Sequence, residues 1–466
     1  MNYYLAVDIG ASSGRMILSH MEKKKIILEE IHRFENGMKK KGGHLVWDTE
    51  MLFCEILDGM KKCKKLDKVP KSMGIDTWAV DYVFLDENDQ MVGDAVGYRD
   101  RRTVGMDAKV YEKIDENQLY ATTGIQKQMF NTIYQLMSVK LYEPLLMEKA
   151  KSMLLIPDYF HFLLTGRKVT EYTNATTTQL LNPITKNWDY KLIDSLGFKR
   201  EIFQKIGMPG EKVGVLTPEI EQIVGFSCRV ILPATHDTAS AVMAVPSVGD
   251  DTLYISSGTW SLMGTEINEA ICSQKSKELN FTNEGGYNCK YRFLKNIMGM
   301  WMINSVRREL APERTFQKIC EEAEKQTITS VVDANAERFL APGSMAEEVQ
   351  KACRETGQQI PKGIDEIAAV IYRSLAQCYA KTSREIEEIT GKTFGCIYVI
   401  GGGANAAYLN KITAQACGKK VLAGPVEATA IGNIVSQMIA SSELKDLTEA
   451  RSCIRESFPI KEYSGL

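Results

Sequence analysis

The sequence lacks an excess of charge of either sign and has no apolar run long enough to cross a membrane. Its 57 Lys and Arg residues balance 59 Asp and Glu residues, for a formal net charge of −2. This balance gives no electrostatic reason to expect nucleic acid or an anionic membrane as a partner. The first residues, MNYYLAVDIG, contain neither the basic segment nor the apolar core of a signal peptide. We therefore expect a cytoplasmic protein.

Paired cysteine motifs are also missing. The 11 cysteines are odd in number, irregularly spaced and never arranged as C-x-x-C. This usage argues against a disulfide framework and against a zinc site, and it is typical of a reducing compartment. It agrees with the expectation of a cytoplasmic protein.

Strand-like and helix-like patterns alternate along the 466 residues, which predicts an α/β protein of two or three domains. Strands are expected at 3–9, 15–20, 25–34, 72–76, 81–86 and 396–400. The clearest helix is expected at 364–389, where apolar residues recur at helical spacing and Gly391 follows as a C-terminal cap.

A faint internal repeat is the most informative feature of this pattern. Residues 5–18 read LAVDIGASSGRMIL and residues 253–264 read LYISSGTWSLMG, each an apolar strand, a small-residue turn and a second apolar strand. Aligned, Gly10 falls on Gly258, Ala11 on Thr259 and Asp8 on Ser256. The repeat suggests a duplicated fold with a boundary near 245–251, although Gly-Ser turns are common enough to match by coincidence.

Turns of this composition can bind phosphate, because they direct several backbone N–H groups and hydroxyls into one small concavity. Two such hairpins facing each other across a cleft could hold both ends of a triphosphate. Asp8 would then lie near the phosphates, where a carboxylate is favourable only with a cation between them, and Mg²⁺ binds in this way. Arg15 could add a charge-assisted contact. The alternative is a pair of ordinary hairpins with Asp8 as a turn former.

A third element, IGGGAN at 400–405, is a strand end with three glycines that leads into an expected helix at 408–417. Glycines there let a ligand lie against the backbone at the head of a strand. Neither G-x-G-x-x-G nor G-x-x-x-x-G-K-[ST] occurs at these sites, which disfavours a Rossmann dehydrogenase and a P-loop kinase. A further small-residue junction at 424–430 is expected to begin another helix.

The stretch PATHDTASAV at 233–242 sets one carboxylate, Asp237, between an expected strand and an expected small-residue helix. An Asp at such a junction is either a helix N-cap or a reactive group. The stretch by itself leaves both interpretations open.

Taken together, these strings resemble the FGGY carbohydrate kinases, which have the actin/hexokinase/Hsp70 ATPase fold. The residues that carry the resemblance are DIGASSGR (8–15), HRFENG (32–37), GIDTW (74–78), VDYVFLD (80–86), YRDRRT (98–103), PDYFHFLLTG (157–166), EYTNATTTQLLN (171–182), HDTASAV (236–242), SSGTWSLMG (256–264), TNEGG (282–286), LKNIMGMW (294–301), IGGG (400–403) and AGPVEATAIGN (423–433). The resemblance implies two duplicated actin-like ATPase (ribonuclease H-like) domains flanking a catalytic cleft. Residues 1–244 would form the domain that binds sugar and carries the first phosphate hairpin, and residues 245–466 the nucleotide-binding domain.

The resemblance also implies transfer of the γ-phosphoryl group of ATP, with Mg²⁺, to O1 of L-rhamnulose. The implied ATP contacts are Ala11, Ser12, Ser13, Gly14, Arg15, Thr259, Asn304 and Gly402. The implied substrate contacts are Ala79, His236, Asp237, Thr238 and Asn296. Asp237 would accept a proton, which answers the question raised by its position, and Asp8 would act on the metal.

Two positions depart from the family pattern. Ala79 stands where the family usually has glycine, so that a methyl group is added at the sugar, and Asn304 stands where Gln is frequent. A kinase for another ketose, such as L-fuculose or xylulose, is therefore an alternative. More distant alternatives are an ATP-driven switch and a non-catalytic sugar sensor. We expect only a sugar and ATP as partners, and a monomer or weak homo-oligomer.

Overall fold

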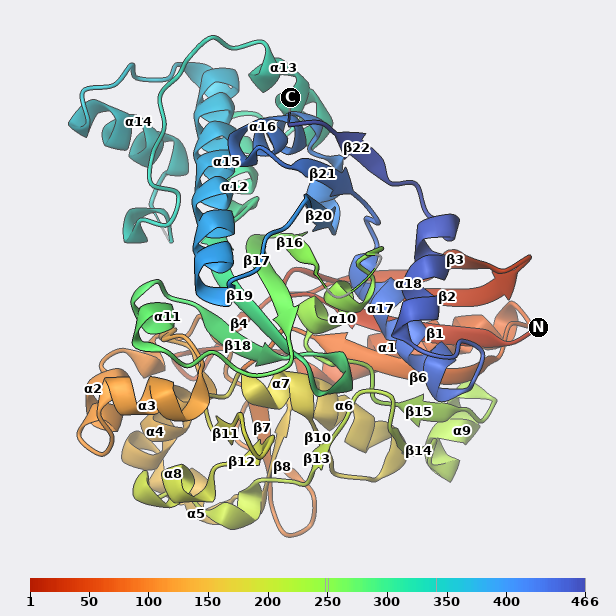
Figure 1. Cartoon of the computed structure of the whole chain (residues 1–466). Helices are drawn as coiled ribbons and strands as arrows, with labels where there is room; N and C mark the ends of the chain where they lie inside the picture. Colours follow the sequence, from red (N-terminus) through yellow and green to blue (C-terminus); the bar gives the residue numbers. More distant parts are fainter. Residues whose placement is uncertain (248, 250, 341, 466) are drawn as a thin grey trace. The chain divides into compact units, whose positions relative to one another are not determined.

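The computed structural model describes residues 1–247, 249, 251–340 and 342–465 (Figure 1). Contacts divide the chain into two compact units. Unit 1 comprises residues 1–244, 267–293 and 429–457, and unit 2 comprises residues 245–266, 294–428 and 458–466. The expected boundary segment, 245–251, includes residues 248 and 250, which lie outside the described residues. Segments 267–293 and 429–457, assigned by sequence to the second domain, thus pack with the first.

Unit 1 is built on a six-stranded sheet in the order β14-β15-β6-β1-β2-β3. Strand β1 pairs antiparallel with β2 and parallel with β6, so it lies inside the sheet. The expected strands at 3–9, 15–20, 25–34 and 72–76 are all present. The bounds of the six strands are β1 (Tyr3–Ile9), β2 (Ser13–Glu22), β3 (Lys25–Glu35), β6 (Pro70–Thr77), β14 (Lys212–Val215) and β15 (Arg229–Ile231).

Short strands and helices complete unit 1. The expected strand at 81–86 is β7, in a small sheet with β8 and β9. The further strands are β4 (Lys39–Lys41), β5 (His44–Val46), β7 (Tyr82–Leu85), β8 (Met91–Val92), β9 (Ser152–Leu155), β10 (Thr170–Glu171), β11 (Leu181–Asn182), β12 (Asn187–Trp188), β13 (Ile206–Gly207) and β18 (Thr282–Gly285). The helices are α1 (Thr49–Lys65), α2 (Met106–Tyr111), α3 (Glu116–Thr123), α4 (Thr132–Tyr142), α5 (Pro144–Lys149), α6 (Ile156–Thr165), α7 (Tyr172–Thr176), α8 (Tyr190–Ser195), α9 (Pro218–Val224), α10 (Asp237–Met243), α11 (Gln274–Glu278), α17 (Ala428–Ala440) and α18 (Leu447–Ser457).

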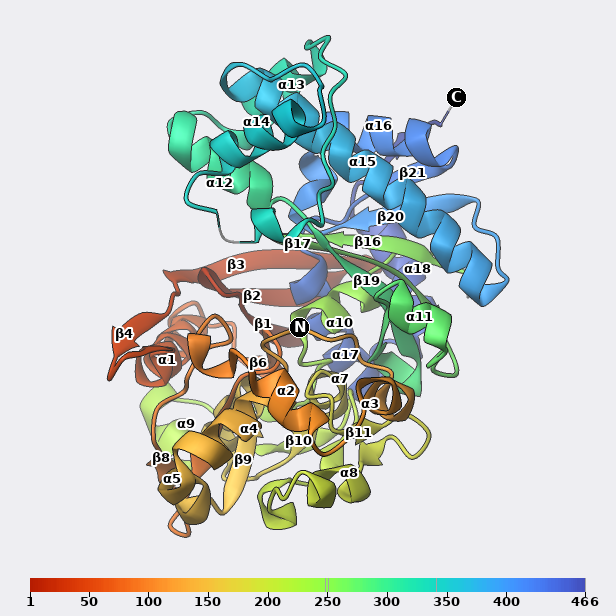
Figure 2. The same cartoon turned by 90° about the vertical axis from the view of Figure 1, so that its left-hand side faces the viewer.

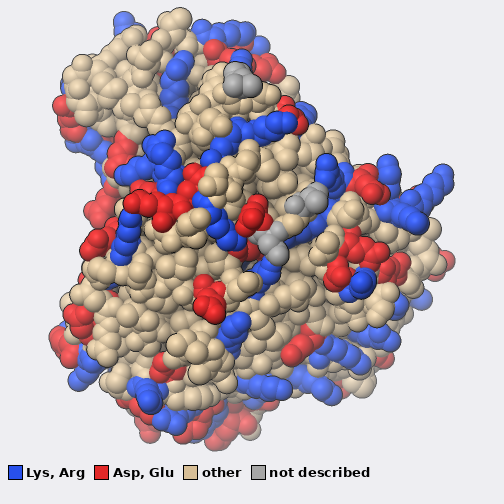
Figure 3. Space-filling model, in the orientation of Figure 1, with Lys and Arg blue, Asp and Glu red and all other residues tan. Residues whose placement is uncertain are grey.

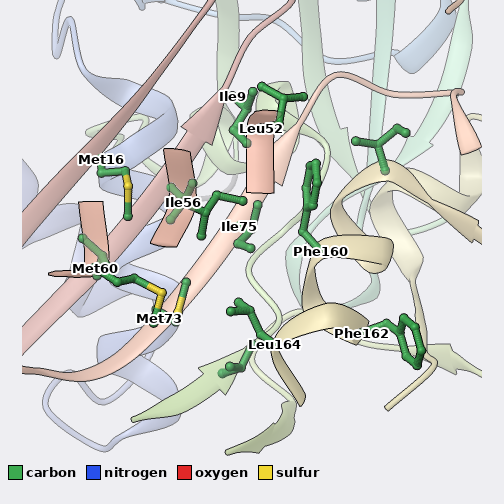
Figure 4. Packing of buried hydrophobic residues seen from close by; sticks show 14 of the residues in the cluster. Ile9, Met16, Leu52, Ile56, Met60, Met73, Ile75, Phe160, Phe162 and Leu164 are labelled. Atoms are coloured by element: carbon green, nitrogen blue, oxygen red, sulfur yellow. The ribbon is translucent and has the colours of Figure 1, made fainter. Parts of the chain in front are cut away.

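The core of unit 1 lies where α1 and α6 cover the six-stranded sheet. Figure 4 shows Leu52, Ile56 and Met60 of α1, and Phe160 and Leu164 of α6, among the apolar side chains of the strands. The α1 residues recur at helical spacing, so that one face of the helix is buried. This packing fixes the carboxyl ends of β1 and β6, from which the acidic residues of the site project.

Unit 2 contains a second sheet in which β19, β17, β16, β20, β21 and β22 follow one another. The expected helix at 364–389 is α15, which ends at Gly391 in the left-handed conformation, with φ of 67°. Figure 2 shows α15 running beside α12 and α16. The bounds are β16 (Leu253–Ser257), β17 (Trp260–Ile267), β19 (Tyr291–Met298), β20 (Cys396–Ile400), β21 (Lys420–Ala423), β22 (Lys461–Tyr463), α12 (Trp301–Leu310), α13 (Phe316–Glu324), α14 (Met345–Glu355), α15 (Gly363–Thr390) and α16 (Ala407–Cys417).

The two sheets share one topology. In unit 1 a hairpin, β1-β2, is joined through its first strand to the parallel strand β6, and β15 follows. In unit 2 the hairpin β16-β17 is joined in the same way to β20, and β21 follows. The hairpins that align in the sequence therefore occupy equivalent places, and the duplication inferred from them is confirmed.

The surface agrees with the charge balance of the sequence. In Figure 3, basic and acidic residues are interspersed over the face in view. All 11 cysteines are free thiols. Among the residues that the structure describes, no helix is both long and apolar enough to span a bilayer.

His161 of α6 gives a prediction about pH and stability. The imidazole is fully buried, Ile75 N–H of β6 donates to its Nε2 at 3.1 Å, and burial lowers the pKa of His161 from 6.5 to about 3. Between these values only the unfolded chain takes up the proton, so His161 removes folding free energy as the pH falls from about 6.5, by up to ~1.4 kcal/mol per pH unit. His161→Gln keeps an acceptor for Ile75 and has no proton to take up.

Chemical denaturation at pH 7.5 and pH 5 measures this effect. We expect the wild type to lose ~1–2 kcal/mol more than His161→Gln on going to pH 5. Equal losses in the two proteins would show that His161 is not the group responsible.

Candidate active site

The β1-β2 hairpin carries a carboxylate and a guanidinium side by side. Asp8 on β1 and Arg15 on β2 are cross-strand partners, and Arg15 donates from Nε at 2.9 Å and Nη2 at 2.8 Å to Asp8 Oδ2. Asp8 is 7% exposed. Burial of a carboxylate is costly unless it is paired, and the guanidinium supplies that pairing. Asp8 is therefore held ionised at the end of its strand.

Asn36, the residue that follows β3, holds the turn of this hairpin in place. Gly10 N–H donates to Ser13 O at 2.9 Å, while Asn36 donates from its backbone to Ser12 O and from Nδ2 to Gly10 O. Ser12 and Ser13 are exposed, Ala11 and Arg15 are half-buried and Gly14 is buried. Exposed hydroxyls on a braced turn fit the predicted contact with phosphate.

Asp76 on β6 is a carboxylate that the sequence interpretation left without a role. It is the cross-strand partner of Asp8 and is fully buried. Burial, the charge of Asp8 and to a lesser degree the charge of Asp237 raise the pKa of Asp76, against a hydrogen bond of 2.6 Å from Asn433 Nδ2. Its Oδ1 has no hydrogen-bond partner among the described residues. An unpaired buried oxygen beside a second acid suits a site that a cation approaches.

Helix α17 holds Asn433 in place. Gln437, one turn later, donates from Nε2 to Asn433 Oδ1 at 2.8 Å and to Leu5 O at 2.9 Å, which directs Asn433 Nδ2 toward Asp76. Gly432 lets α17 approach α10, because a Cβ there would lie 1.7 Å from Ser240 O. The motif AGPVEATAIGN therefore supplies Asn433, which holds the buried Asp76 in place.

The loop with His236 and Asp237 follows β15 and begins α10. Asp237 is the first residue of the helix, and His236 occupies the N-cap position. Asp237 Oδ1 accepts from the residue that follows it, Thr238, at 2.6 Å from N and 3.1 Å from Oγ1. The Asp237 side chain is 34% exposed. The N-cap interpretation is thus wrong, and the carboxylate remains accessible.

Glu171 is the hub that positions this loop. Its buried carboxylate accepts from the backbone N–H and Oγ1 of Thr235, from the same two groups of Thr173, and from Asn174 N–H, at 2.7–3.1 Å. Thr173 Oγ1 in turn accepts from His236 N–H at 3.3 Å. One carboxylate therefore ties α7 to the loop that presents Asp237, and this role accounts for the start of the motif EYTNATTTQLLN.

The loop with Ala79 is held by a second buried acid, Asp81. Asp81 accepts from the indoles of Trp47 and Trp78, from Tyr98 N–H and from Gln135 Nε2, at 2.7–3.0 Å. Burial raises the pKa of Asp81 to about 6. Val80 has φ of 68°, a strained conformation for a β-branched residue that surrounding contacts must maintain. Strain of this kind is frequent at ligand sites, and Ala79 beside it is half-buried.

In unit 2 the second hairpin is braced by α12. Trp301 N–H donates to Thr259 O at 2.9 Å and Met300 N–H to Gly258 O at 3.2 Å, which leaves Thr259 exposed. Asn304 lies one turn along α12 and is half-buried. The predicted ATP contacts Thr259 and Asn304 thus belong to one corner of the unit, and the half-buried Asn296 lies on β19.

The three glycines at the end of β20 lie against this hairpin. Gly401 has φ of 80°, and a Cβ on Gly403 would lie 2.0 Å from Ser257 Oγ. Gly402 is exposed, with open space where a side chain would be. A ligand can therefore approach the backbone at Gly402.

The structure thus gathers the predicted residues of each unit. Asp8, the turn at 11–15 and the loop at 236–238 project from strands of one sheet, and Thr259, Gly402 and Asn304 from one region of the other. Among the described residues, no group of three or more His, Cys, Asp or Glu side chains could hold a metal by itself. A metal that binds through one or two carboxylates and phosphate oxygens needs no such group. Asp8 is therefore the residue that could contact one.

A cavity of about 1070 Å³ lies elsewhere in unit 1, lined by residues that include Lys113, Ile184, Lys191, Glu269 and Tyr291. No predicted site residue lines it. Its acid Asp189 caps α8 by accepting from Leu192 N–H at 3.0 Å. The cavity has an exposed acid, Glu269, but none of the small-residue turns lines it, so it is not the candidate site.

Comparisons with known proteins agree on one family. Models described as the N-terminal and C-terminal domains of the FGGY family of carbohydrate kinases match residues 3–244 and 253–441. A protein named rhamnulokinase from Halalkalibacterium halodurans is 53% identical, over 99% of this chain and 99% of its own. Another of that name, from Bacillus subtilis, is 45% identical over 99% of this chain and 95% of its own.

Solved structures show the same fold at low identity. A ligand-bound xylulose kinase from Lactobacillus acidophilus has a TM-score of 0.82 at 17% identity, over 100% of this chain and 94% of its own. Plasmodium falciparum glycerol kinase with ADP has a TM-score of 0.79 at 15% identity, over 99% and 94%. The expected fold, two domains of the actin-like ATPase architecture, is confirmed.

The hub role of Glu171 gives a prediction. Glu171→Gln keeps the shape but turns an amide toward donors from Thr173 and Thr235, so we expect it to lower the free energy of unfolding by ~1–3 kcal/mol. Asp158→Asn is the matched control, because burial and the Glu171 charge raise the pKa of Asp158 well above its ordinary value and its Oδ2 has no partner among the described residues. We expect that variant to change stability by less than ~1 kcal/mol. Chemical denaturation of both measures the difference, and equal effects would rule out the hub.

Proposed function

The chain belongs to the FGGY family of carbohydrate kinases, and we propose that it transfers the γ-phosphoryl group of ATP to O1 of L-rhamnulose. The products are L-rhamnulose 1-phosphate and ADP, as a step in L-rhamnose catabolism in the cytoplasm. Relatives named rhamnulokinase that match the chain end to end support this substrate. Sugar kinases of this family act on a sugar and ATP and use a divalent metal ion.

One observation carries the chemical assignment. Of the carboxylates near the strand ends of unit 1, Asp8, Asp76 and Glu171 are buried, whereas Asp237 is 34% exposed on its side chain. Among the described residues, it accepts hydrogen bonds from Thr238, and His236 Nε2 lies 3.5 Å from its Oδ1. A general base must reach its substrate, and the exposure of Asp237 meets that requirement.

In the reaction, O1 of the ketose attacks the γ-phosphorus, and the bond from that phosphorus to the β,γ-bridging oxygen breaks. Asp237 accepts the O1 proton and orients the attacking oxygen. His236 and Thr238 bind the ketose around that oxygen, with Ala79 and Asn296. Most of the acceleration comes from positioning and charge neutralisation, since phosphoryl transfer has a loose transition state.

The nucleotide is bound by residues from both halves of the chain. Ala11, Ser12, Ser13, Gly14 and Arg15 contact its phosphates from the 1–244 domain. Thr259, Asn304 and Gly402 contact it from the 245–466 domain. Asp8 would hold Mg²⁺, the metal that we assign, and the bound ion would supply positive charge to neutralise the phosphates. The buried Asp76 oxygen beside Asp8 supports a cation there.

Ala79 keeps a second candidate substrate open. Its methyl group is additional to the family pattern, and one methyl in a tight pocket changes discrimination by ~1–3 kcal/mol. Because Val80 is held at a positive φ, the backbone of this loop has little freedom to move away from the added methyl group. A kinase for L-fuculose or xylulose is the alternative that this position favours.

Asp237→Asn tests the base. The amide keeps the size of the side chain and cannot take a proton, so we expect kcat to fall by at least ~10². The KM for ATP and the melting temperature should stay nearly unchanged. Asp189→Asn is the matched control, because Asp189 is a true N-cap, and Asn caps a helix equally well. Asp237→Asn retaining more than roughly a tenth of wild-type kcat would overturn the assignment.

Ala79→Gly tests the sugar contact. We expect kcat/KM for ketoses to change while the KM for ATP does not, since the backbone at 79 would face only the sugar. ADP release with L-rhamnulose, L-fuculose, D-xylulose and glycerol compares the substrates in both proteins. If the wild type is most active on another of these substrates, that substrate replaces L-rhamnulose in the proposal. If Ala79→Gly changes the kinetic constants for sugar and for ATP equally, Ala79 is not a sugar contact.

A further inference from the structure

His236 has charged neighbours on both ring nitrogens, and one of them is a buried arginine outside the motifs quoted above. Arg292 of β19 is fully buried, and its Nη2 lies 3.0 Å from His236 Nδ1. Glu284 of β18 lies 3.4 Å from the same nitrogen, through Oε2. On the other side, His236 Nε2 lies 3.5 Å from Asp237 Oδ1.

Arg292 and Glu284 hold each other in place. Arg292 Nη2 lies 3.0 Å from Glu284 Oε2, and Arg292 Nε donates to Gly285 O at 2.8 Å. Burial acts to raise the pKa of Glu284, but its charged surroundings, chiefly the Arg292 guanidinium, outweigh burial and lower that pKa. The pair is therefore ionised, with its guanidinium fixed against His236.

The donors and acceptors then assign the proton on the ring. A guanidinium has only N–H groups and cannot accept, so the nitrogen that faces it must present a lone pair. Nδ1 faces Arg292, which leaves the proton of a neutral imidazole on Nε2. That N–H points to the side on which Asp237 lies.

We infer that Arg292, held by Glu284, is a positioning residue that keeps the proton of the His236 ring on Nε2, beside Asp237. The tautomer follows from geometry alone, whereas its effect on catalysis rests on the proposed function, in which Asp237 is the base. A neutral donor can orient Asp237, or a hydroxyl bound to it, without removing the basicity of that carboxylate. An imidazolium in the same place would stabilise the ionised acid and weaken the base.

Without Arg292, we expect the proton of the His236 ring to move to Nδ1. Nδ1 would face only Glu284, a carboxylate that accepts, so it would take up a proton as the Nδ1–H tautomer or as the imidazolium. Without the Glu284 charge, Arg292 still faces Nδ1, and the ring keeps its Nε2–H form. The two substitutions therefore predict opposite protonation at Nδ1, although both break the same ion pair.

Long-range ¹H–¹⁵N correlation spectra of ¹⁵N-histidine-labelled enzyme at pH 7.5 read the tautomers directly. The sequence has only five histidines, and His161→Gln and His236→Gln assign two of them. His161 is an internal reference of the opposite form, because its Nε2 accepts from Ile75 N–H. We expect His236 as Nε2–H in the wild type and in Glu284→Gln, and protonated at Nδ1 in Arg292→Met.

The kinetic expectation is a fall in kcat for Arg292→Met of at least tenfold at pH 6.5, with a smaller fall at pH 8.5 as the imidazolium loses its proton. The KM for ATP should not change. Arg451→Met is the matched control, since Arg451 is a buried arginine of unit 1 that donates to Val242 O at 3.0 Å, near the end of α10 opposite His236. We expect it to leave the His236 spectrum unchanged.

Two results would overturn the inference: a wild-type His236 protonated at Nδ1, or an unchanged His236 tautomer in Arg292→Met. The first needs no variant, so it stays decisive if Arg292→Met does not fold. A loss of activity in Asp237→Asn smaller than expected would overturn the proposed base and leave the tautomer result intact, so the two failures are distinguishable.

Discussion

The burial of carboxylates on the strands of unit 1 is the constraint on which its candidate site depends. A buried acid costs several kcal/mol unless donors or a cation compensate it. Each acid here has its own compensation: Arg15 for Asp8, Asn433 for Asp76, five donors for Glu171 and Arg292 for Glu284. These partners come from distant parts of the chain, so the acids fix the loops around them. As a consequence, Asp237 lies on a loop that these contacts hold in place, while its own carboxylate stays accessible.

The duplicated topology explains why the second hairpin resembles the first without repeating its chemistry. Both hairpins are braced at the turn by a segment from outside, Asn36 in one case and the start of α12 in the other. The equivalent of Asp8 is Ser256, so only the first hairpin has an acid and its arginine. The second presents Thr259 beside exposed backbone at Gly402.

Much of the fold and part of the site were predictable from local signals. Strand runs such as 3–9, the helix at 364–389 with its Gly391 cap, and the paired hairpins all arise from periodicity and turn composition, which act over short distances. The choice between cap and reactive group for Asp237 was not predictable in this way. Both interpretations use the same residues, and they differ only in whether the carboxylate turns back on its own helix.

The sequence by itself determined the α/β class, the duplicated hairpins and the chemical groups at their ends, because these depend on neighbouring residues. Only the tertiary structure decided which groups meet. Asp76 lies beside Asp8 through strand register, Glu171 reaches Thr235 across 64 residues, and Arg292 faces His236 from 56 residues away. Such contacts leave no periodic signal, since a buried acid or arginine is defined by its partner and not by its neighbours in the chain.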